Sequence, residues 1–190
     1  MSKPFSDFTG VFFWDFKRMD NVNYNFKILE LLYKTKKRDS SRLFNKPILV
    51  TLVSIIECAL YDFVKRVDQH RGEVVPNLDK IAVIDSRRKT YTDQLETIIA
   101  YIKKHDLLRA SEDENPDIYD ILDFLRKIRN RLHIQNSQNF LDENEYKIWT
   151  EKNLHLGEKA LERVCEVLCH VYPRPGSNFY SMSDFPRVWE

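Results

Sequence analysis

The chain has 190 residues, 43% hydrophobic and 31% charged, which is long enough for one domain with a core and typical of a globular rather than a disordered protein. Thirty basic and 29 acidic residues leave a net charge of +1, which excludes a global attraction to nucleic acid and leaves a local basic patch as the route to RNA binding. Only four glycines occur, and this scarcity favours long helices over sandwiches or α/β folds.

Residues 1–20 are crowded with aromatic side chains at no clear period, so we expect this segment to dock onto the domain or a partner. The helix expected at 47–69 is apolar nearly all round, which is typical of the central helix of a bundle. Pro173 and Pro175 end the last helix and begin a tail. The apolar spacing predicts five helices, at about residues 21–38, 47–69, 89–104, 117–134 and 142–172.

The predicted fold class is therefore all-α. We expect a single-domain helical bundle of about five helices over residues 21–172, with aromatic-rich extensions at 1–20 and 173–190.

Membrane, redox and metal signals are weak throughout the sequence. No run of about 18 uncharged apolar residues occurs, and the N-terminus lacks the apolar region of a secretory signal, so we expect no spanning helix. Cys58, Cys165 and Cys169 lie in apolar helical patterns and are odd in number, which favours buried free thiols and a cytoplasmic location. Cys165, Cys169 and His170 lie about one helical turn apart, but no second ligand pair appears elsewhere. We expect no metal and no cofactor.

The segment Arg126-Lys-Ile-Arg-Asn-Arg-Leu-His133 is the most specific pattern in the chain. At 100° per residue, four of its polar side chains lie within about 100° of arc on one side of the expected helix: Arg126, Arg129, Asn130 and His133. The neighbouring apolar face, which includes Leu132, is expected to pack into the core.

This set of side chains suits phosphoryl chemistry on RNA. An imidazole titrates near neutrality and can take or give a proton. Guanidinium groups offer forked donors to phosphate and to the additional charge of the transition state. RNA supplies its own nucleophile in the 2′-hydroxyl, so neither a metal nor a covalent intermediate is needed. The ordinary alternative is an exposed cationic helix end, which the helix dipole favours.

The segment Leu125-Arg-Lys-Ile-Arg-Asn-Arg-Leu-His-Ile134 resembles the signature of the HEPN superfamily. Members are helical domains marked by an arginine, usually four to six intervening residues, and a histidine, with a polar residue (often Asn) directly after the arginine. The family also has a long apolar helix earlier in the chain, and this sequence shares that arrangement over residues 20–172.

The match leaves the identity of the motif arginine open. Arg126 has six residues before His133, within the range of the family, but Lys127 follows it. Arg129 is followed by Asn130 but has only three residues before His133. Either arginine can hold the motif position.

The resemblance implies a metal-independent endoribonuclease acting on RNA. Active members are typically homodimers in which two motifs form one composite cleft, and many serve in toxin–antitoxin, abortive-infection or other anti-phage systems, which implies an antitoxin or defence-system partner. His133 would transfer protons, Arg126 or Arg129 would stabilise the phosphate, and Asn130 would orient the phosphate or the histidine. The flanking cations Lys127 and Arg131 are expected to bind RNA.

Some HEPN members have lost catalysis. The alternative function is therefore an inactive helical module that binds a partner protein, a nucleotide or RNA.

Glu57 interrupts the apolar helix expected at 47–69. A carboxylate buried there without a partner would cost several kcal/mol. We therefore expect Glu57 to face the helix at 117–134 and to hold Arg129 or Asn130 in place. The alternative is that Glu57 reaches solvent at the surface of the bundle.

Overall fold

The computed structural model describes residues 5–39, 41–75, 94–109, 117–132, 144–177, 181 and 185–190. All regular structure in these ranges is helical, so the predicted all-α class is confirmed. The helices of ten residues or more are α2 (Phe16–Arg38), α3 (Asn45–Gln69), α5 (Leu95–Lys104), α6 (Ile118–Arg129) and α8 (Glu151–His170). The shorter elements are α1 (Phe5–Thr9), α4 (Arg71–Val74), α7 (Glu145–Ile148) and the 3-10 turns η1 (Arg42–Phe44) and η2 (Asn130–Leu132).

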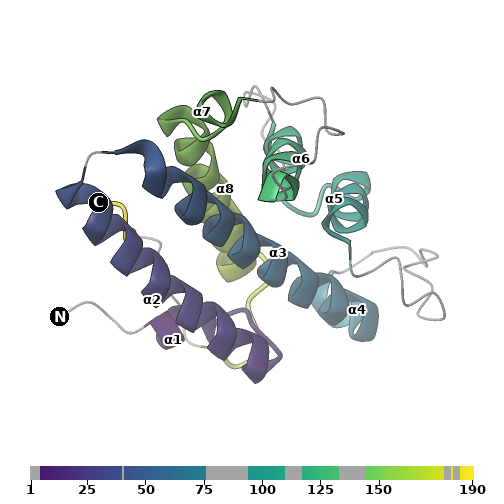
Figure 1. Ribbon diagram of the computed structural model, residues 1–190. Coiled ribbons are helices and arrows are strands. Elements are labelled where there is room, and N and C mark those ends of the chain that lie inside the picture. The colour runs from purple at the N-terminus through teal and green to yellow at the C-terminus, as the bar shows by residue number, and fades with distance from the viewer. Residues whose placement is uncertain are drawn as a thin grey trace.

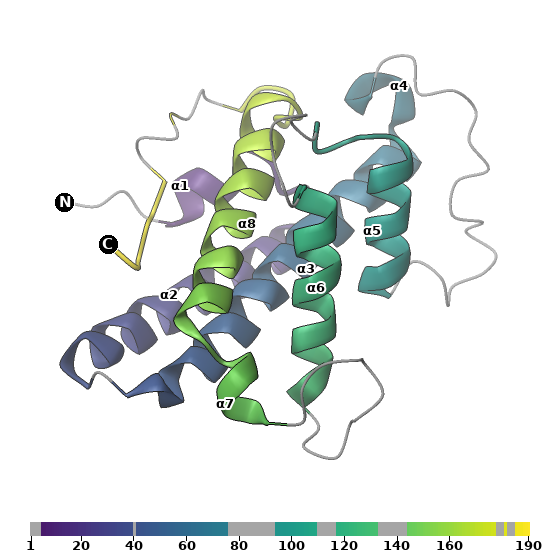
Figure 2. The ribbon, with the colours of Figure 1, turned by 90° about the horizontal axis from the view of Figure 1, so that it is seen from above.

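The α3 helix is the centre of the bundle and contacts α2, α5, α6 and α8 (Figures 1 and 2). The stretch Arg42–Gln69 is long and apolar enough to cross a membrane by length and composition, but 61% of its most apolar window is buried inside the fold. A helix that is apolar nearly all round needs neighbours on every side, and the surrounding helices of this bundle provide them.

α8 packs tightly against α3 at Gly157. A Cβ atom added there would lie 2.5 Å from Cδ1 of Leu49. Glycine therefore lets the Leu49 side chain of α3 pack directly against the backbone of α8.

The aromatic N-terminal segment packs onto the bundle. Phe8, Phe12 and Phe13 are each at most 4% exposed, and the Phe5 ring stacks on Phe26 of α2 at 5.1 Å. The side chain of Arg66, buried in α3, donates to the carbonyl oxygen of Phe12 at 3.4 Å. These contacts fix the start of the chain against α2 and α3.

Two helix boundaries differ from the sequence prediction because polar side chains cap the helices. α2 begins at Phe16 instead of near residue 21, and the Asp15 carboxylate accepts from the Arg18 N–H at 3.0 Å. The helix expected at 142–172 is broken into α7 and α8. The Thr150 hydroxyl accepts from the Asn153 N–H at 3.2 Å and starts α8 at Glu151.

The helices before the signature also differ from prediction. α5 begins at Leu95, after Gln94 in an extended conformation, instead of near residue 89. The short helix α4 lies between the helices expected at 47–69 and 89–104, where the apolar spacing predicts no helix.

The predicted arc of polar side chains along residues 126–133 assumed a continuous α-helix, and the end of α6 differs from that prediction. The α-helix stops at Arg129, and Asn130–Leu132 continue as a 3-10 turn. Because a 3-10 turn advances 120° per residue, the α-helical angles do not extend to these positions. Leu132, expected in the core, is 46% exposed, and Arg131, expected at the surface as an RNA-binding cation, is 4% exposed.

Candidate functional site

The C-terminal half of α6 carries the arginines of the signature. Asp117 caps the N-terminus of the helix, because its carboxylate accepts from the Asp120 N–H at 2.8 Å. Its buried residues, Leu122, Leu125 and Ile128 among them, fix the rotation of the helix against the core. Arg126 and Arg129 therefore lie at the edge of the packed face.

Arg126 is fixed by carboxylates from two helices. Its Nε and Nη2 atoms donate to Oδ1 of Asp123 at 3.0 and 2.8 Å, and its Nη1 atom donates to Oε2 of Glu96 at 3.1 Å. The side chain is 13% exposed. Arg126 thus ties α6 to α5 and has a single well-defined orientation.

Arg129 points to α3 and pairs with Glu57. Its Nη2 atom donates to Oε2 of Glu57, and its Nη1 atom lies 3.5 Å from Oδ1 of Asn130. The contact expected between Glu57 and the signature helix is therefore present. The two side chains are 32% and 21% exposed, so the pair is open to solvent on one side.

These side chains surround one shallow depression of about 240 Å³, called here the arginine hollow. It lies where α6 faces α3 and the first turn of α5, helices that lie side by side in Figure 2. Its walls are mostly polar or charged. The lining residues are Glu57, Gln94, Leu95, Glu96, Arg126, Arg129 and Asn130.

The hydrogen bonds of the two arginines distinguish them. A guanidinium group has five N–H donors. Arg126 uses three of them on carboxylates, which leaves two. Arg129 uses one on Glu57 and one, at a long distance, on Asn130, which leaves three. Arg129 is also the more exposed, so it can offer more donors to an anion entering the hollow.

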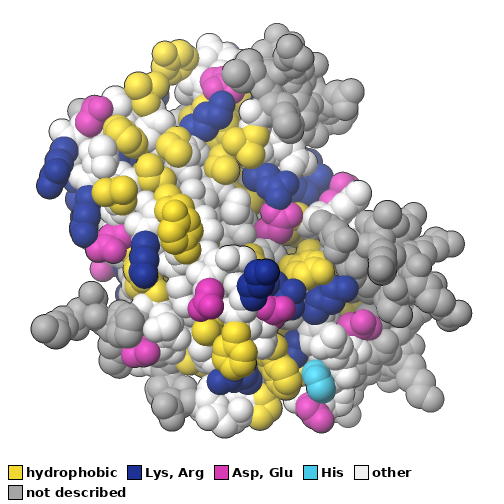
Figure 3. Space-filling view, turned by 60° about the horizontal axis from the view of Figure 1, so that its bottom comes forward, with side chains coloured by type: hydrophobic (Ala, Val, Ile, Leu, Met, Phe, Trp, Pro, Cys, Tyr) yellow, Lys and Arg dark blue, Asp and Glu magenta, His cyan; other side chains and the backbone are white. Residues whose placement is uncertain are grey.

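The local charge is balanced rather than strongly basic. Lys127 Nζ lies 2.8 Å from Oδ2 of Asp123, so Asp123 forms ion pairs with both Lys127 and Arg126. Burial favours the neutral form of Asp123, but the hydrogen bonds from Lys127 and Arg126 outweigh it and hold the pKa of Asp123 below its usual value. On the face shown in Figure 3, where the bottom of Figure 1 comes forward, basic and acidic side chains are also mixed. Any anion binding here depends on the geometry of the arginines.

The structure places the predicted residues unequally. Arg126, Arg129, Asn130 and Glu57 line the same hollow, whereas His133 lies outside the described residues. Lys127 lies at the surface and is paired with Asp123, and Arg131 is buried. Neither residue lines the hollow.

Glu96 and Asp123 are the site residues that sequence reasoning missed. The spacing of Asp123 from Arg126 and Lys127, three and four residues, is the spacing of helical ion pairs, and the sequence contains this signal. Glu96 comes from another helix and has no such local signal. Its role depends on how α5 packs beside α6.

The carboxylates of the hollow are committed to the arginines. Among the residues that the structure describes, no group of three or more His, Cys, Asp or Glu side chains could hold a metal ion. What the arrangement offers to a ligand is guanidinium N–H donors, which suit a phosphate or another oxyanion.

Comparison of the chain with protein-family models, with curated proteins and with solved structures finds no match. Inference about function therefore rests on the geometry of the arginine hollow and on the sequence pattern from Arg126 to His133.

Proposed function

We propose that this chain is a metal-independent endoribonuclease of the HEPN type, with its active site at the arginine hollow. The observation that carries the proposal is that Arg126 and Arg129 line one hollow on the last turns of α6, directly before His133 in the chain. Carboxylates from α3, α5 and α6 hold the two guanidinium groups, so their orientation is set before a substrate binds.

The proposed reaction needs one base, one acid and stabilisation of charge. His133 removes the proton of the 2′-hydroxyl, and the 2′-oxygen attacks phosphorus. The 5′-oxygen of the next nucleotide leaves and receives a proton. The products are a 2′,3′-cyclic phosphate, which water can open to a 3′-phosphate, and a 5′-hydroxyl. Arg129, with Arg126 behind it, stabilises the charge on the phosphate oxygens, and Asn130 orients the phosphate or the imidazole.

A homodimer would supply the second proton-transfer group. A two-fold axis close to the signature duplicates His133, so that one copy acts as base and the other as acid. A toxin or anti-phage effector, regulated by an antitoxin or defence-system partner, is the biological role that the signature favours.

Cleavage of RNA in EDTA by the wild-type protein and by His133→Ala tests the proposal. We expect the substitution to lower the rate by about 10²-fold or more, the contribution typical of general acid–base catalysis. His155→Ala is the matched control, because His155 is an exposed histidine of α8. An RNA with a single 2′-deoxy sugar at the cut should resist cleavage there. Equal rates for all three proteins, or cleavage of the deoxy strand, would contradict the proposal.

The alternative, a catalytically inactive module that binds a partner protein, a nucleotide or RNA, is favoured by one observation. Glu57, Glu96 and Asp123 already neutralise much of the charge of the arginines. An inactive module predicts RNA retention without cleavage in the same assay, or no interaction with RNA.

A further inference from the structure

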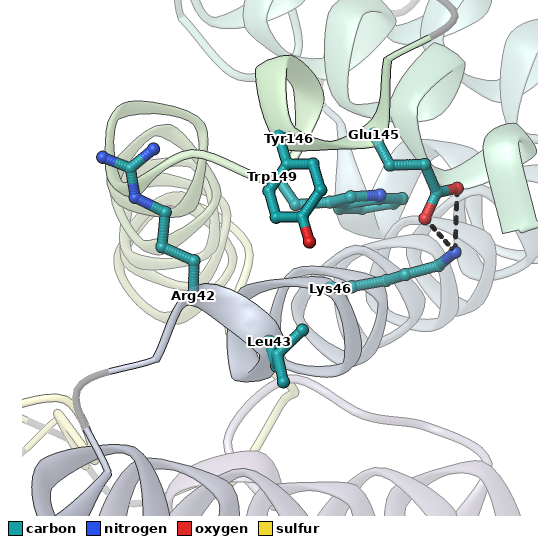
Figure 4. A pocket seen from close by; sticks show the side chains of 6 residues that line it. All are labelled: Arg42, Leu43, Lys46, Glu145, Tyr146 and Trp149. Atoms are coloured by element: carbon teal, nitrogen blue, oxygen red, sulfur yellow. Dashed lines mark hydrogen bonds and ion pairs between the residues drawn. The ribbon is translucent and has the colours of Figure 1, made fainter.

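A second hollow of about 190 Å³, called here the tyrosine hollow, lies at the N-terminal end of α3 (Figure 4). Its walls come from η1, from the first turn of α3, and from α7 with the residue that follows it. The lining residues are Arg42, Leu43, Lys46, Glu145, Tyr146 and Trp149.

Two exposed side chains and one buried ring define its shape. Tyr146 and Leu43 are each 73% exposed, whereas Trp149 is 5% exposed. Figure 4 shows the Tyr146 ring standing over the hollow with its hydroxyl directed toward Leu43, and the Trp149 indole behind it. A single exposed apolar residue needs no explanation, but a flat ring beside a hollow offers a stacking surface.

The polar groups of the hollow favour an anionic ligand. Lys46 Nζ is paired with Glu145 at 2.9 and 3.0 Å and lies 5.3 Å from the centre of the Trp149 ring. Arg42 is exposed and forms no direct ion pair within the described part of the chain, although its charge acts on the nearby carboxylate of Glu151. The Trp149 Nε1–H is buried without a hydrogen-bond partner among the same residues. An exposed guanidinium and an unsatisfied donor both favour a ligand that brings acceptor oxygens.

Size limits what can bind. Pockets that enclose a whole small molecule measure roughly 300 to 1,000 Å³, and this hollow measures about 190 Å³. It therefore fits one flat group with the remainder of the ligand outside. A base stacked on an aromatic ring, with its phosphate at an arginine, is the recurring way in which proteins hold single-stranded nucleic acid.

We infer that the tyrosine hollow binds one unpaired nucleotide of a single-stranded RNA, with the base stacked on Tyr146 and the adjacent phosphate held by Arg42. The inference rests on the proposed function, because it assigns a second contact for the same substrate. Lys46 and Glu57 are eleven residues apart on α3, which is about 16 Å along the helix axis. One RNA strand can span that distance from the arginine hollow.

The first test measures binding of a fluorescent 12-nucleotide 2′-O-methyl RNA by anisotropy, since this strand has no 2′-hydroxyl nucleophile to be cleaved. Tyr146→Ala should weaken binding about tenfold or more, the loss typical of one stacked base, and Tyr146→Phe should stay within about twofold because it keeps the ring. Tyr24→Ala is the matched control, since Tyr24 is 66% exposed on α2.

The second test concerns the phosphate contact. Arg42→Gln should weaken binding several-fold and reduce the slope of log affinity against log salt by about 0.7, the value of one phosphate contact on a single strand. Lys27→Gln removes an exposed cation from α2 and should leave both values unchanged. The loss caused by Tyr146→Ala should disappear when the same sequence is presented as a duplex, because paired bases are not free to stack.

The outcomes separate this inference from the proposed function. Cleavage in EDTA with full RNA affinity in Tyr146→Ala would overturn the inference and leave the ribonuclease proposal standing. Binding that depends on Tyr146 without any cleavage would support the inference and contradict the ribonuclease proposal. A Tyr146→Ala protein that binds RNA normally but loses a protein partner would overturn it, because the hollow would then be a protein-docking surface.

Discussion

Glu57 and Asp62 are two carboxylates of α3, and each pairs with an arginine from another helix. They differ in their burial and in the number of hydrogen-bond donors that they accept from. Asp62 accepts from Nε of Arg18 on α2 at 2.9 Å, and Glu57 accepts from Arg129 on α6. They are five residues apart, so they project about 140° apart around the helix axis. One therefore faces the N-terminal side of the fold and the other faces the signature.

The difference lies in burial and in the number of donors. Asp62 is 2% exposed and also accepts from the backbone N–H groups of Trp14 and Asp15, at 2.9 and 3.4 Å. The Glu57 side chain is 21% exposed and borders the arginine hollow. Asp62 is buried and accepts hydrogen bonds from several donors, so its role is to hold the N-terminal segment and α2 against α3. Glu57 is partly exposed and orients Arg129, which can still reach a ligand in the hollow.

The largest expected effect comes from Asp62→Ala. The substitution leaves two backbone N–H groups and part of the Arg18 charge without an acceptor, and should lower the free energy of unfolding by about 3 kcal/mol. Urea denaturation followed by circular dichroism measures it. Asp20→Ala, at an exposed position of α2, is the control and should cost less than about 0.5 kcal/mol. A change below about 1 kcal/mol for Asp62→Ala would show that the anchor is not structural.

Glu57→Ala should give a smaller loss of stability and a larger loss of activity. Because the pair with Arg129 is partly exposed, we expect the free energy of unfolding to fall by only about 1.5 kcal/mol. RNA cleavage should fall by about 10- to 100-fold, since Arg129 loses its fixed orientation. Glu30→Ala, which breaks an exposed pair with Lys34 on α2, is the control for both values. A stability loss equal to that of Asp62→Ala would remove the distinction between the two carboxylates.

Apolar periodicity predicted the fold class and the five long helices because burial of apolar surface is the main driving force of folding and leaves a repeating pattern in the sequence. It did not predict the ends. Asp15 starts α2 five residues before the expected position, and Thr150 divides the last predicted helix. These boundaries depend on a single side-chain hydrogen bond each, which a period of 3.6 residues does not report.

The candidate site was predictable only in part, for a related reason. The charge of Glu57 in an apolar helix indicated a partner on α6, and the structure pairs it with Arg129. The change to a 3-10 turn after Arg129, which turns Arg131 inward, depends on how the end of α6 packs against its neighbours. Glu96 reaches Arg126 from another helix, and no local pattern contains that contact.

The ion pairs around Asp123 should make a small, pH-dependent contribution to stability. The pKa of Asp123 lies below its usual value of 3.8 in the folded protein, so its contribution is present in full above that value and is lost as pH falls through the lower, folded pKa. The difference in free energy of unfolding between wild type and Asp123→Asn should therefore be below about 1 kcal/mol at pH 7 and should shrink toward zero as the pH falls below 3.8. Urea titrations at several pH values measure it. High salt at pH 7 should reduce the same difference, and a difference that grows on acidification would contradict this account.

Cys58 lies between the two carboxylates in the sequence. The reactivity of its thiol depends on the charges of both, so it can be used to compare them without a mutation at Cys58. Burial raises the pKa of its thiol from 9.0 to about 11, with the negative charge of Asp62 adding to the rise, the positive charge of Arg18 opposing it, and Glu57 adding less. At pH 8 the thiolate population, and with it the rate of alkylation by iodoacetamide, should be about a hundredfold below that of an ordinary thiol.

Asp62→Asn should speed alkylation of Cys58 more than Glu57→Gln does, because the charge of Asp62 has the larger effect on this thiol. Mass spectrometry resolves the rate at each cysteine, and buried Cys165 is the internal control, since its modification would signal unfolding rather than a change of pKa. A faster reaction in Glu57→Gln than in Asp62→Asn, with Cys165 still protected, would contradict the larger effect of the Asp62 charge on this thiol.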